Sequence, residues 1–333
     1  MAAETPPATT AADGETHLSA ILPVEQAGER LDRALAQVFP DYSRTHLKQW
    51  IEAGLVLVDG NPARPRDKVR GGETVQLQVK LAPQGGWSAE DIPLPIVFED
   101  ADLIVIDKPA GLVVHPGAGN SQGTLANALL HRYPELETLP RAGIVHRLDK
   151  DTSGLLVAAR SLRAHHSLVK QLQARTVSRE YEAIVYGLMI AGGTVDAPLG
   201  RHARDRTRQA VVEDGREAVT HYRVLRRFRA HTHIRLQLET GRTHQIRVHM
   251  AHVGYPLVGD PTYGGRARGI AGASAELIAM LRAFKRQALH ASRLSLLHPA
   301  DRGEMRWQAP LPADMTELLK ALAADCPGSP LTR

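Results

Sequence analysis

The spacing of hydrophobic and polar residues changes several times along this chain, and each change marks an expected element. In residues 31–38 and 47–51 apolar side chains recur every three or four positions, which predicts two short amphipathic helices, the second capped by Ser43. Residues 54–61 lead an apolar run into an Asp-Gly turn, and residues 71–79 alternate. These two patterns are typical of a hairpin and a strand.

A longer region with a different pattern follows residues 81–95, whose prolines and glycines predict a linker. The pattern beyond it predicts strands and helices without the regular alternation of a parallel fold. Strands are expected at residues 103–106, 155–159, 181–185, 222–225 and 234–238, and helices at 124–131 and 162–173. The sequence therefore predicts a small N-terminal domain followed by a large domain of mixed α and β structure.

Composition agrees with two domains in a reducing compartment. The chain has 333 residues, and its 43% hydrophobic content can fill two cores. The single cysteine, Cys326, excludes an internal disulfide framework. Residues 1–16 have no basic residue and no apolar run, so they differ from a signal peptide and predict a disordered tail. No stretch has the length of a membrane span, and we expect a cytoplasmic protein without a membrane partner.

Positive charge is concentrated in one part of the chain. The net charge is +5, and residues 201–250 alone hold twelve arginines against five acidic residues. Guanidinium groups pair with phosphate through two hydrogen bonds at once, so nucleic acid is the favoured partner. Arginine greatly outnumbers lysine in the whole chain, and a bias in genomic base composition is an alternative explanation.

The segment with the most chemistry is a charged run between two apolar stretches that we expect to be buried strands: His146–Gly154, flanked by residues 142–145 and 155–159. If the run is extended up to Asp151, then Arg147, Asp149 and Asp151 share one face, and the residues after it form a turn. A carboxylate between cations stays ionised, so Asp149 is suited to act as a nucleophile or base. A structural salt-bridged turn would have the same composition.

A second candidate segment is Ser178–Gly187. Its strand alternation places Tyr181 on one face with Ala183 and Val185. The tyrosine hydroxyl then lies near the charged end of an apolar surface. The pattern allows either a core tyrosine or an aromatic platform for a nucleobase.

A third segment, Thr240–Met250, combines arginines with a helical pattern. We expect Thr243 to cap the helix and Gly254 to end it. Arg242 then lies at the helix N-terminus, where backbone amides favour an anion such as phosphate. Arg247 lies one turn further along the helix.

The sequence contains no cofactor motif, neither a phosphate-binding Walker loop nor a dinucleotide fingerprint. His249 and His252 are spaced to share a helix face, which raises the possibility of zinc. No carboxylate ligand or HExxH spacing accompanies them. We therefore expect neither a metal nor a cofactor.

Taken together, the three segments resemble the motifs of the RluA family of RNA pseudouridine synthases. His146–Gly154 is similar to the family's catalytic motif, Ser178–Gly187 to its tyrosine motif and Thr240–Met250 to its basic motif. The resemblance extends to an S4 RNA-binding domain and to three further segments: residues 29–79, 113–120, 256–265 and 286–291.

This resemblance implies a domain organisation and a fold class. A tail would be followed by the S4 domain, a linker, the catalytic domain and a second tail: residues 1–16, 17–80, 81–95, 96–325 and 326–333. The fold implied is α+β, with a mixed, largely antiparallel central sheet preceded by the small α/β S4 domain.

The resemblance also implies a reaction, the isomerisation of uridine to pseudouridine. The bond from sugar to nitrogen breaks, the base turns, and a bond from sugar to carbon forms, so no redox centre or energy source is required. The carboxylate that reacts would be Asp149, by attack on the sugar or the base or by removal of a sugar proton. Arg147 would hold the uridine out of its stack, Tyr181 would pack against the base, and Arg247 would pair with Asp149.

The partner implied is 23S ribosomal RNA in pre-50S particles, with the stem-loop of helix 69 as the expected target of a monomeric enzyme. Expected RNA contacts are Arg30, Arg44, Lys48 and Arg242. Two alternatives remain open. One is a non-catalytic S4 protein in ribosome assembly, and the other is a glycoside or nucleoside hydrolase that uses two carboxylates, Asp149 and Asp151.

Overall fold

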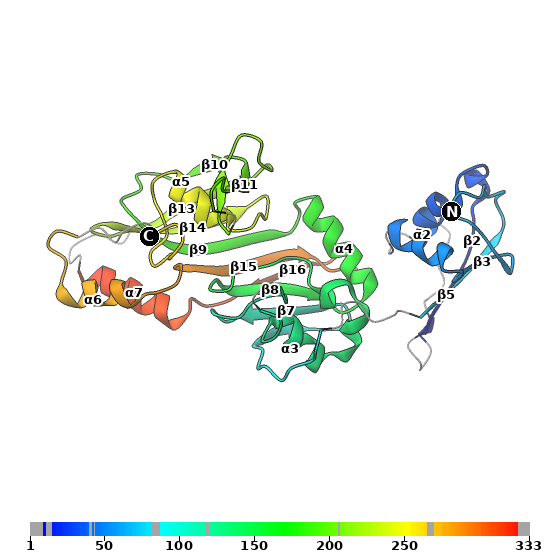
Figure 1. Cartoon of the computed structure of the whole chain (residues 1–333), viewed down its shortest axis with the longest axis horizontal. Helices are drawn as coiled ribbons and strands as arrows, with labels where there is room; N and C mark the ends of the chain where they lie inside the picture. The colour runs from blue at the N-terminus through cyan, green and yellow to red at the C-terminus, as the bar shows by residue number, and fades with distance from the viewer. Residues whose placement is uncertain are drawn as a thin grey trace.

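The structure is a computed structural model, and it describes residues 9–10, 15–39, 42, 44–80, 87–117, 120–205, 207–264 and 270–325. The chain forms a small N-terminal domain and a larger domain, which Figure 1 shows at opposite ends of the long axis. Both combine sheets with helices, and the sheet of the larger domain is mixed. The α+β class predicted from the sequence is confirmed.

The N-terminal domain packs two helices against a sheet in the order β1-β2-β5-β3-β4. The helices are α1 (Leu31–Val38) and α2 (Arg44–Glu52), and the strands are β1 (Thr9–Thr10), β2 (Glu15–Ile21), β3 (Val56–Val58), β4 (Asn61–Pro62) and β5 (Thr74–Lys80). The apolar stripes of both helices are buried with β3 and β5, at Leu31, Leu35, Leu47, Val56, Val75 and Leu77. Both predicted helices are confirmed, while the predicted cap Ser43 lies outside the described residues.

The predicted hairpin is also present. Asp59 and Gly60 connect β3 to β4 with φ angles of 49° and 76°, which is the backbone of a type I′ turn. The predicted boundary of the disordered tail needs correction, because Glu15 and Thr16 pair with β5 in register. Backbone hydrogen bonding to a neighbouring strand needs no apolar side chain, so composition gave no sign of it.

The larger domain is built on a sheet in the order β10-β13-β14-β9-β15-β8-β7-β6, with β16 paired to β15. Its strands are β6 (Ile96–Glu99), β7 (Leu103–Lys108), β8 (Ser153–Ala159), β9 (Ser178–Tyr186), β10 (Gly193–Asp196), β13 (Val219–Arg227), β14 (His231–Leu238), β15 (Leu289–Leu297) and β16 (Glu304–Gln308). A separate ribbon pairs β11 (Leu199–Arg201) with β12 (Gln209–Val211). Among the paired strands of the described residues, only β8 and β15 run parallel.

Helices lie on both faces of this sheet. They are α3 (Leu125–Arg132), α4 (Leu162–Gln173), α5 (Gln245–His252), α6 (Ala275–Ala283) and α7 (Ala313–Ala324). Every residue of β8 is buried. Leu156 belongs to the same core as Leu129 of α3, whereas Leu155 belongs to the same core as Leu168 of α4. The strand that follows the charged run is therefore clamped between two layers of helix.

The charged run itself differs from the expectation. Residues 142–145 form no strand, because the chain turns through a short helical segment at 140–143 in which Arg141 and Ala142 have φ angles of 54° and 51°. The run is not extended either. The Thr152 amide donates to the Asp149 carbonyl at 3.1 Å and closes a turn there, so Arg147, Asp149 and Asp151 do not share a strand face. Strand β8 begins only at Ser153.

The end of the charged run is fixed by its parallel neighbour. Gly154 has a φ angle of +110°, and a Cβ atom on it would lie 2.3 Å from the carbonyl oxygen of Ala291 in β15. A glycine is therefore required where the loop enters the sheet.

Candidate active site

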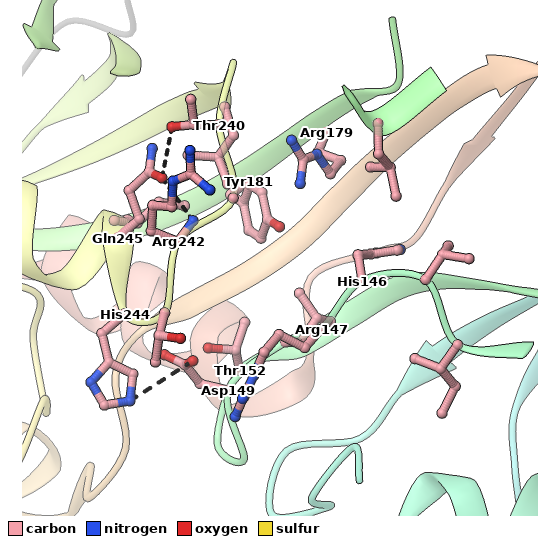
Figure 2. A pocket seen from close by; sticks show the side chains of 18 of the residues that line it. His146, Arg147, Asp149, Thr152, Arg179, Tyr181, Thr240, Arg242, His244 and Gln245 are labelled. Carbon is pink, nitrogen blue, oxygen red and sulfur yellow. Dashed lines mark hydrogen bonds and ion pairs between the residues drawn. The ribbon is translucent and has the colours of Figure 1, made fainter. Parts of the chain in front are cut away.

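A cleft of about 840 Å³ opens where the three candidate segments meet. It is lined by residues of the turn before β8, of β9 and of the loop and helix that follow β14. All five residues predicted to act there contribute to its lining: Arg147, Asp149, Tyr181, Arg242 and Arg247. Figure 2 shows Tyr181 and Arg179 on the strand side of the cleft, facing the turn that carries His146, Arg147 and Asp149.

Asp149 lies deep in the cleft, with its side chain 14% exposed. Its Oδ2 accepts a hydrogen bond of 3.1 Å from Nη1 of Arg247. Its Oδ1 lies 4.0 Å from Nε2 of His244. The carboxylate is therefore held from one side and still open to a ligand in the cleft, as a nucleophile or base has to be.

The cation beside Asp149 is itself anchored by a second carboxylate that the sequence analysis missed. Arg247 donates through Nε and Nη2 to the two oxygens of Asp260, at 2.7 and 2.9 Å. The Asp260 side chain is fully buried and accepts two more bonds, from the amides of Thr262 and Tyr263. A bidentate pair of this kind fixes the plane of the guanidinium. The remaining nitrogen of the guanidinium, Nη1, then points at Asp149.

Charge and burial act in opposite directions on this pair. Burial alone would raise the pKa of Asp260, but hydrogen bonds and charge from Arg247 hold it below its ordinary value. Burial alone would lower the pKa of Arg247, and the bonds and charge of Asp260, aided by Asp149, raise it instead. Both groups are therefore charged at neutral pH.

The turn that carries Asp149 is supported by residues distant in sequence. Lys108, which is fully buried at the end of β7, donates from Nζ to the carbonyls of Pro109, Leu112 and Lys150, each at 2.9 Å. Burial lowers its pKa to about 8, opposed by the charges of Asp151 and Asp149. Because lysine donates three bonds, these carbonyls satisfy it completely. Lys108 thus ties the turn to the loop after β7.

A second support comes from the segment before β15. Arg286 donates to the Asp151 carbonyl at 3.2 Å while its other nitrogens bind Asp314. Gln287 donates to the Thr152 hydroxyl at 3.0 Å. Asp151 does not contribute to the lining of the cleft, so it does not face Asp149 as the second carboxylate of a glycoside hydrolase would.

Tyr181 confirms the predicted strand alternation, because Tyr181, Ala183 and Val185 are all buried in β9. Burial raises the pKa of its hydroxyl, which stays protonated. Two positions earlier, Arg179 has a buried Nε that makes no hydrogen bond in the described structure. A Cβ on Gly241 would lie 2.6 Å from the Arg179 guanidinium. The sequence therefore leaves room for this cation beside the tyrosine.

The basic segment folds differently at its start from what was expected. The helix α5 begins at Gln245, and its cap is His244 in a left-handed conformation without a side-chain cap bond, not Thr243. The Gln245 side chain instead closes the loop before the helix, because its Oε1 accepts from the Arg242 amide at 2.9 Å. Arg242 still lines the cleft, and its Nε donates to the Glu217 carbonyl. Gly254 follows the end of α5 as predicted.

His249 is the better placed of the two residues considered for zinc, and it is fully buried. Its ring nitrogens contact the Thr220 hydroxyl at 2.9 Å and the Ala197 carbonyl at 3.0 Å. Both nitrogens are therefore already engaged. Within the described residues no group of three or more potential ligands gathers around a common point.

The predicted RNA contacts of the N-terminal domain also lie together. Arg30, Arg44 and Lys48 line one groove, together with Arg64 and Arg66. The sequence analysis missed the residue that organises them, Asp32 on α1, which accepts bonds from Arg30 at 2.9 Å and Arg44 at 2.7 Å. Those bonds outweigh the effect of burial and lower the pKa of Asp32.

Comparisons with known proteins identify the family and the fold of this chain. The model of the RNA pseudouridylate synthase family matches residues 102–252, and the S4 domain model matches residues 29–75. A solved structure titled Human RNA Pseudouridylate Synthase Domain Containing 4 covers 68% of this chain and 92% of its own, with a TM-score of 0.54 and 28% identity. Human RNA Pseudouridylate Synthase Domain Containing 1 shares the fold, with a TM-score of 0.52 and 24% identity over 72% of this chain and 99% of its own.

Curated relatives are much more similar. Proteins named Ribosomal large subunit pseudouridine synthase D from Xanthomonas campestris and Pseudomonas aeruginosa are each 58% identical, over 92% of this chain and 92% and 96% of their own length. The protein of that name from Escherichia coli K12 is 56% identical over 92% of this chain and 95% of its own. The chain belongs to the RNA pseudouridine synthase family. None of the helices in the described part of the chain has the length and apolar character that a membrane crossing requires.

Proposed function

We propose that this enzyme isomerises uridines of 23S ribosomal RNA, in the stem-loop of helix 69, and that Asp149 is the carboxylate that reacts. The large-subunit RNA is inferred from the name of the relatives that are 58% identical to the chain, Ribosomal large subunit pseudouridine synthase D. Helix 69 as the target is what the family resemblance of the sequence implies. The observation that carries the catalytic assignment is the hydrogen bond from Arg247 to Asp149 inside the cleft. It holds the carboxylate through Oδ2, in the lining of a cleft with room for a nucleotide.

The proposed roles follow from the neighbours of this carboxylate. Asp149 attacks the sugar or the base, or removes a sugar proton, while Arg247 fixes its orientation. Tyr181 stacks on the displaced base, since its ring is buried on β9 and reaches the cleft. Unstacking a base costs a few kcal/mol, and stacking on an aromatic side chain offsets a cost of this size. No step calls for a redox group or an energy source.

RNA binding is assigned to two basic surfaces. In the cleft, Arg147, Arg179 and Arg242 contribute guanidinium groups to the lining, and the buried Nε of Arg179 has no partner in the described structure. A buried donor without a partner is costly unless a ligand satisfies it. The groove around Arg44 and Lys48 in the S4 domain offers the second surface. We propose that both follow the sugar-phosphate backbone of one folded RNA, which a monomer can engage in pre-50S particles.

The direct test is Asp149→Asn, which keeps the shape of the side chain and removes its charge. We expect pseudouridine formation to be abolished, with folding and RNA affinity nearly unchanged. Pseudouridines would be mapped in 23S RNA from cells that carry the wild type, the variant or neither. Turnover above a few per cent of wild type would contradict the role of Asp149. Pseudouridines that depend on this protein but lie outside helix 69 would contradict the proposed target.

The alternative of a non-catalytic assembly factor makes the opposite prediction. In that case Asp149→Asn would leave any growth or assembly phenotype untouched, and the RNA map would not depend on the protein.

A further inference from the structure

His244 occupies a position in the cleft that the roles of Asp149, Arg247 and Tyr181 do not explain. Its backbone has φ 57° and ψ 18°, a left-handed conformation that is costly for most side chains. The ring is 21% exposed and lies between two other side chains of the site. Its Nε2 is 4.0 Å from Oδ1 of Asp149, and its Nδ1 is 2.9 Å from the hydroxyl of Tyr263. Figure 2 shows the ring turned toward Asp149.

The contacts of Tyr263 favour one of the two ring nitrogens of His244 as the one that carries the proton. The backbone amide of Gln209 donates to the Tyr263 hydroxyl at 2.8 Å. This oxygen is therefore already an acceptor, and its own hydrogen is free to point at Nδ1 of His244. If Nδ1 accepts, the proton of a neutral imidazole is on Nε2. Nε2 is the nitrogen that faces Asp149.

From this chain of contacts we infer that His244 is a positioning residue, whose Nε2–H holds Oδ1 of Asp149 while Arg247 holds Oδ2. The two donors would fix the plane of the carboxylate before the nucleotide binds. The separation of 4.0 Å between Nε2 and Oδ1 is longer than a hydrogen bond, and such contacts tighten when a site closes on its substrate. The proposal rests on Asp149 as the reacting carboxylate.

Burial keeps the imidazole neutral, against the opposing charge of Asp149. Burial lowers the pKa of His244, and the nearby cations Arg247 and Arg147 act in the same direction, while Asp149 and Asp260 oppose them. Tyr263 faces the other side of the ring and is held by cations too, with the guanidinium carbons of Arg247 and Arg208 at 5.0 and 5.2 Å from its ring centre. The neutral form, with a single proton to place, is therefore the form present at neutral pH.

Two substitutions separate this role from a purely structural one. His244→Gln places an amide donor near the position of Nε2, so it can still reach Asp149. His244→Asn places its amide near Nδ1 and cannot reach Asp149, yet asparagine tolerates a left-handed backbone better than glutamine does. A structural role therefore favours Asn over Gln in stability and activity alike. The positioning role predicts the opposite order of activity.

The experiment measures single-turnover rates and RNA affinity on a saturating stem-loop. We expect His244→Asn to lose about tenfold or more in rate with unchanged affinity, the order expected for one hydrogen bond to a charged group. His244→Gln should retain several times more of the rate. Equal rates for the two variants, or a faster Asn variant, would overturn the proposal. Asp149→Asn is measured in parallel, and if it remains active, the assignment of the site fails irrespective of His244.

A readout that does not depend on activity is the tautomer itself. Nitrogen NMR of the full-length protein labelled at histidine, with His244→Gln used to assign the signal, reports which ring nitrogen bears the proton. We expect Nε2–H at about pH 7.5 in the wild type, above the ordinary imidazole pKa. In Tyr263→Phe the imidazole loses the donor to Nδ1, so the pKa of His244 should rise and the ring should protonate at higher pH than in the wild type. A proton on Nδ1 in the wild type would refute the proposal even if the kinetic order were as expected.

Discussion

Replacing Arg247 by methionine should slow the chemical step far more than it weakens RNA binding. Methionine has a similar length but no charge and no donor. The change removes three hydrogen bonds, two of them to Asp260 at 2.7 and 2.9 Å and one to Asp149 at 3.1 Å. Asp260 is then a buried carboxylate whose remaining partners, among the described residues, are the amides of Thr262 and Tyr263.

The magnitude follows from the burial of the pair. The side chain of Arg247 is 7% exposed and that of Asp260 is fully buried, so solvent replaces little of the interaction that the substitution removes. Removing one partner of such a pair costs about 3–5 kcal/mol. If the whole of this free energy is lost in the transition state, the rate decreases by about two to three and a half orders of magnitude. Any part of this free energy that is lost in the folded protein itself lowers the free energy of unfolding.

The assay therefore measures three quantities on the same preparations: the single-turnover rate at saturating RNA, the dissociation constant for RNA, and the urea midpoint. Arg247→Lys is the matched control, because an ammonium keeps the charge but cannot bind Asp260 with two parallel bonds while pointing a third at Asp149. We expect it to fall between wild type and Arg247→Met in rate. A weaker RNA affinity with an unchanged single-turnover rate would refute the reasoning and identify Arg247 as a phosphate contact.

Two further predictions address the support of the site and the division of labour between the domains. Lys108→Met should lower the urea midpoint, because it removes the donor that the carbonyls of Pro109 and Leu112 share with that of Lys150. The Lys150 carbonyl keeps the amide of Gly111, and an unsatisfied buried group costs about 1–3 kcal/mol. An unchanged midpoint would show that other groups satisfy the carbonyls of Pro109 and Leu112. Deleting residues 1–80 should reduce the slope of log affinity against log salt by roughly 0.7–0.9 for each phosphate that the N-terminal domain neutralises. Slow modification of a saturating stem-loop should persist. Equal slopes together with complete loss of turnover would mean that the N-terminal domain organises the active site.

The elements that the sequence predicted well are those whose signal is local. The helix at residues 162–173 and the strand around Tyr181 are present because their hydrophobic period matches a buried face. The Asp-Gly hairpin turn is present because two successive residues there need positive φ. Resemblance to a family supplied the functional segments, and the cleft brings the residues of these segments together.

The wrong predictions share a different cause, which is that the backbone of the site is irregular. Residues 142–145 are apolar and suggested a strand, but only Ile144 makes an isolated bridge, to Ala158. Thr243 has the composition of a cap, yet α5 begins after His244, which makes no side-chain cap bond. The hydrophobic periods of two residues for a strand and 3.6 residues for a helix do not apply to such turns. The identity of a capping group there depends on which side chain the tertiary fold brings close.

The shape of the Asp149 turn is encoded far from the turn itself. The carbonyl of Lys150 accepts from the side chain of Lys108 and from the amide of Gly111, and the carbonyl of Asp151 accepts from Arg286, which lies 135 residues further along the chain. Each of these donors is an ordinary basic or backbone group in its own local sequence. They act on the turn only because β7, β8 and β15 are neighbours in one sheet. The carboxylate of Asp149, proposed to be catalytic, lies on an irregular turn that gains its rigidity from this sheet, and any change that separates β8 from β15 should disorder the turn before it affects the core.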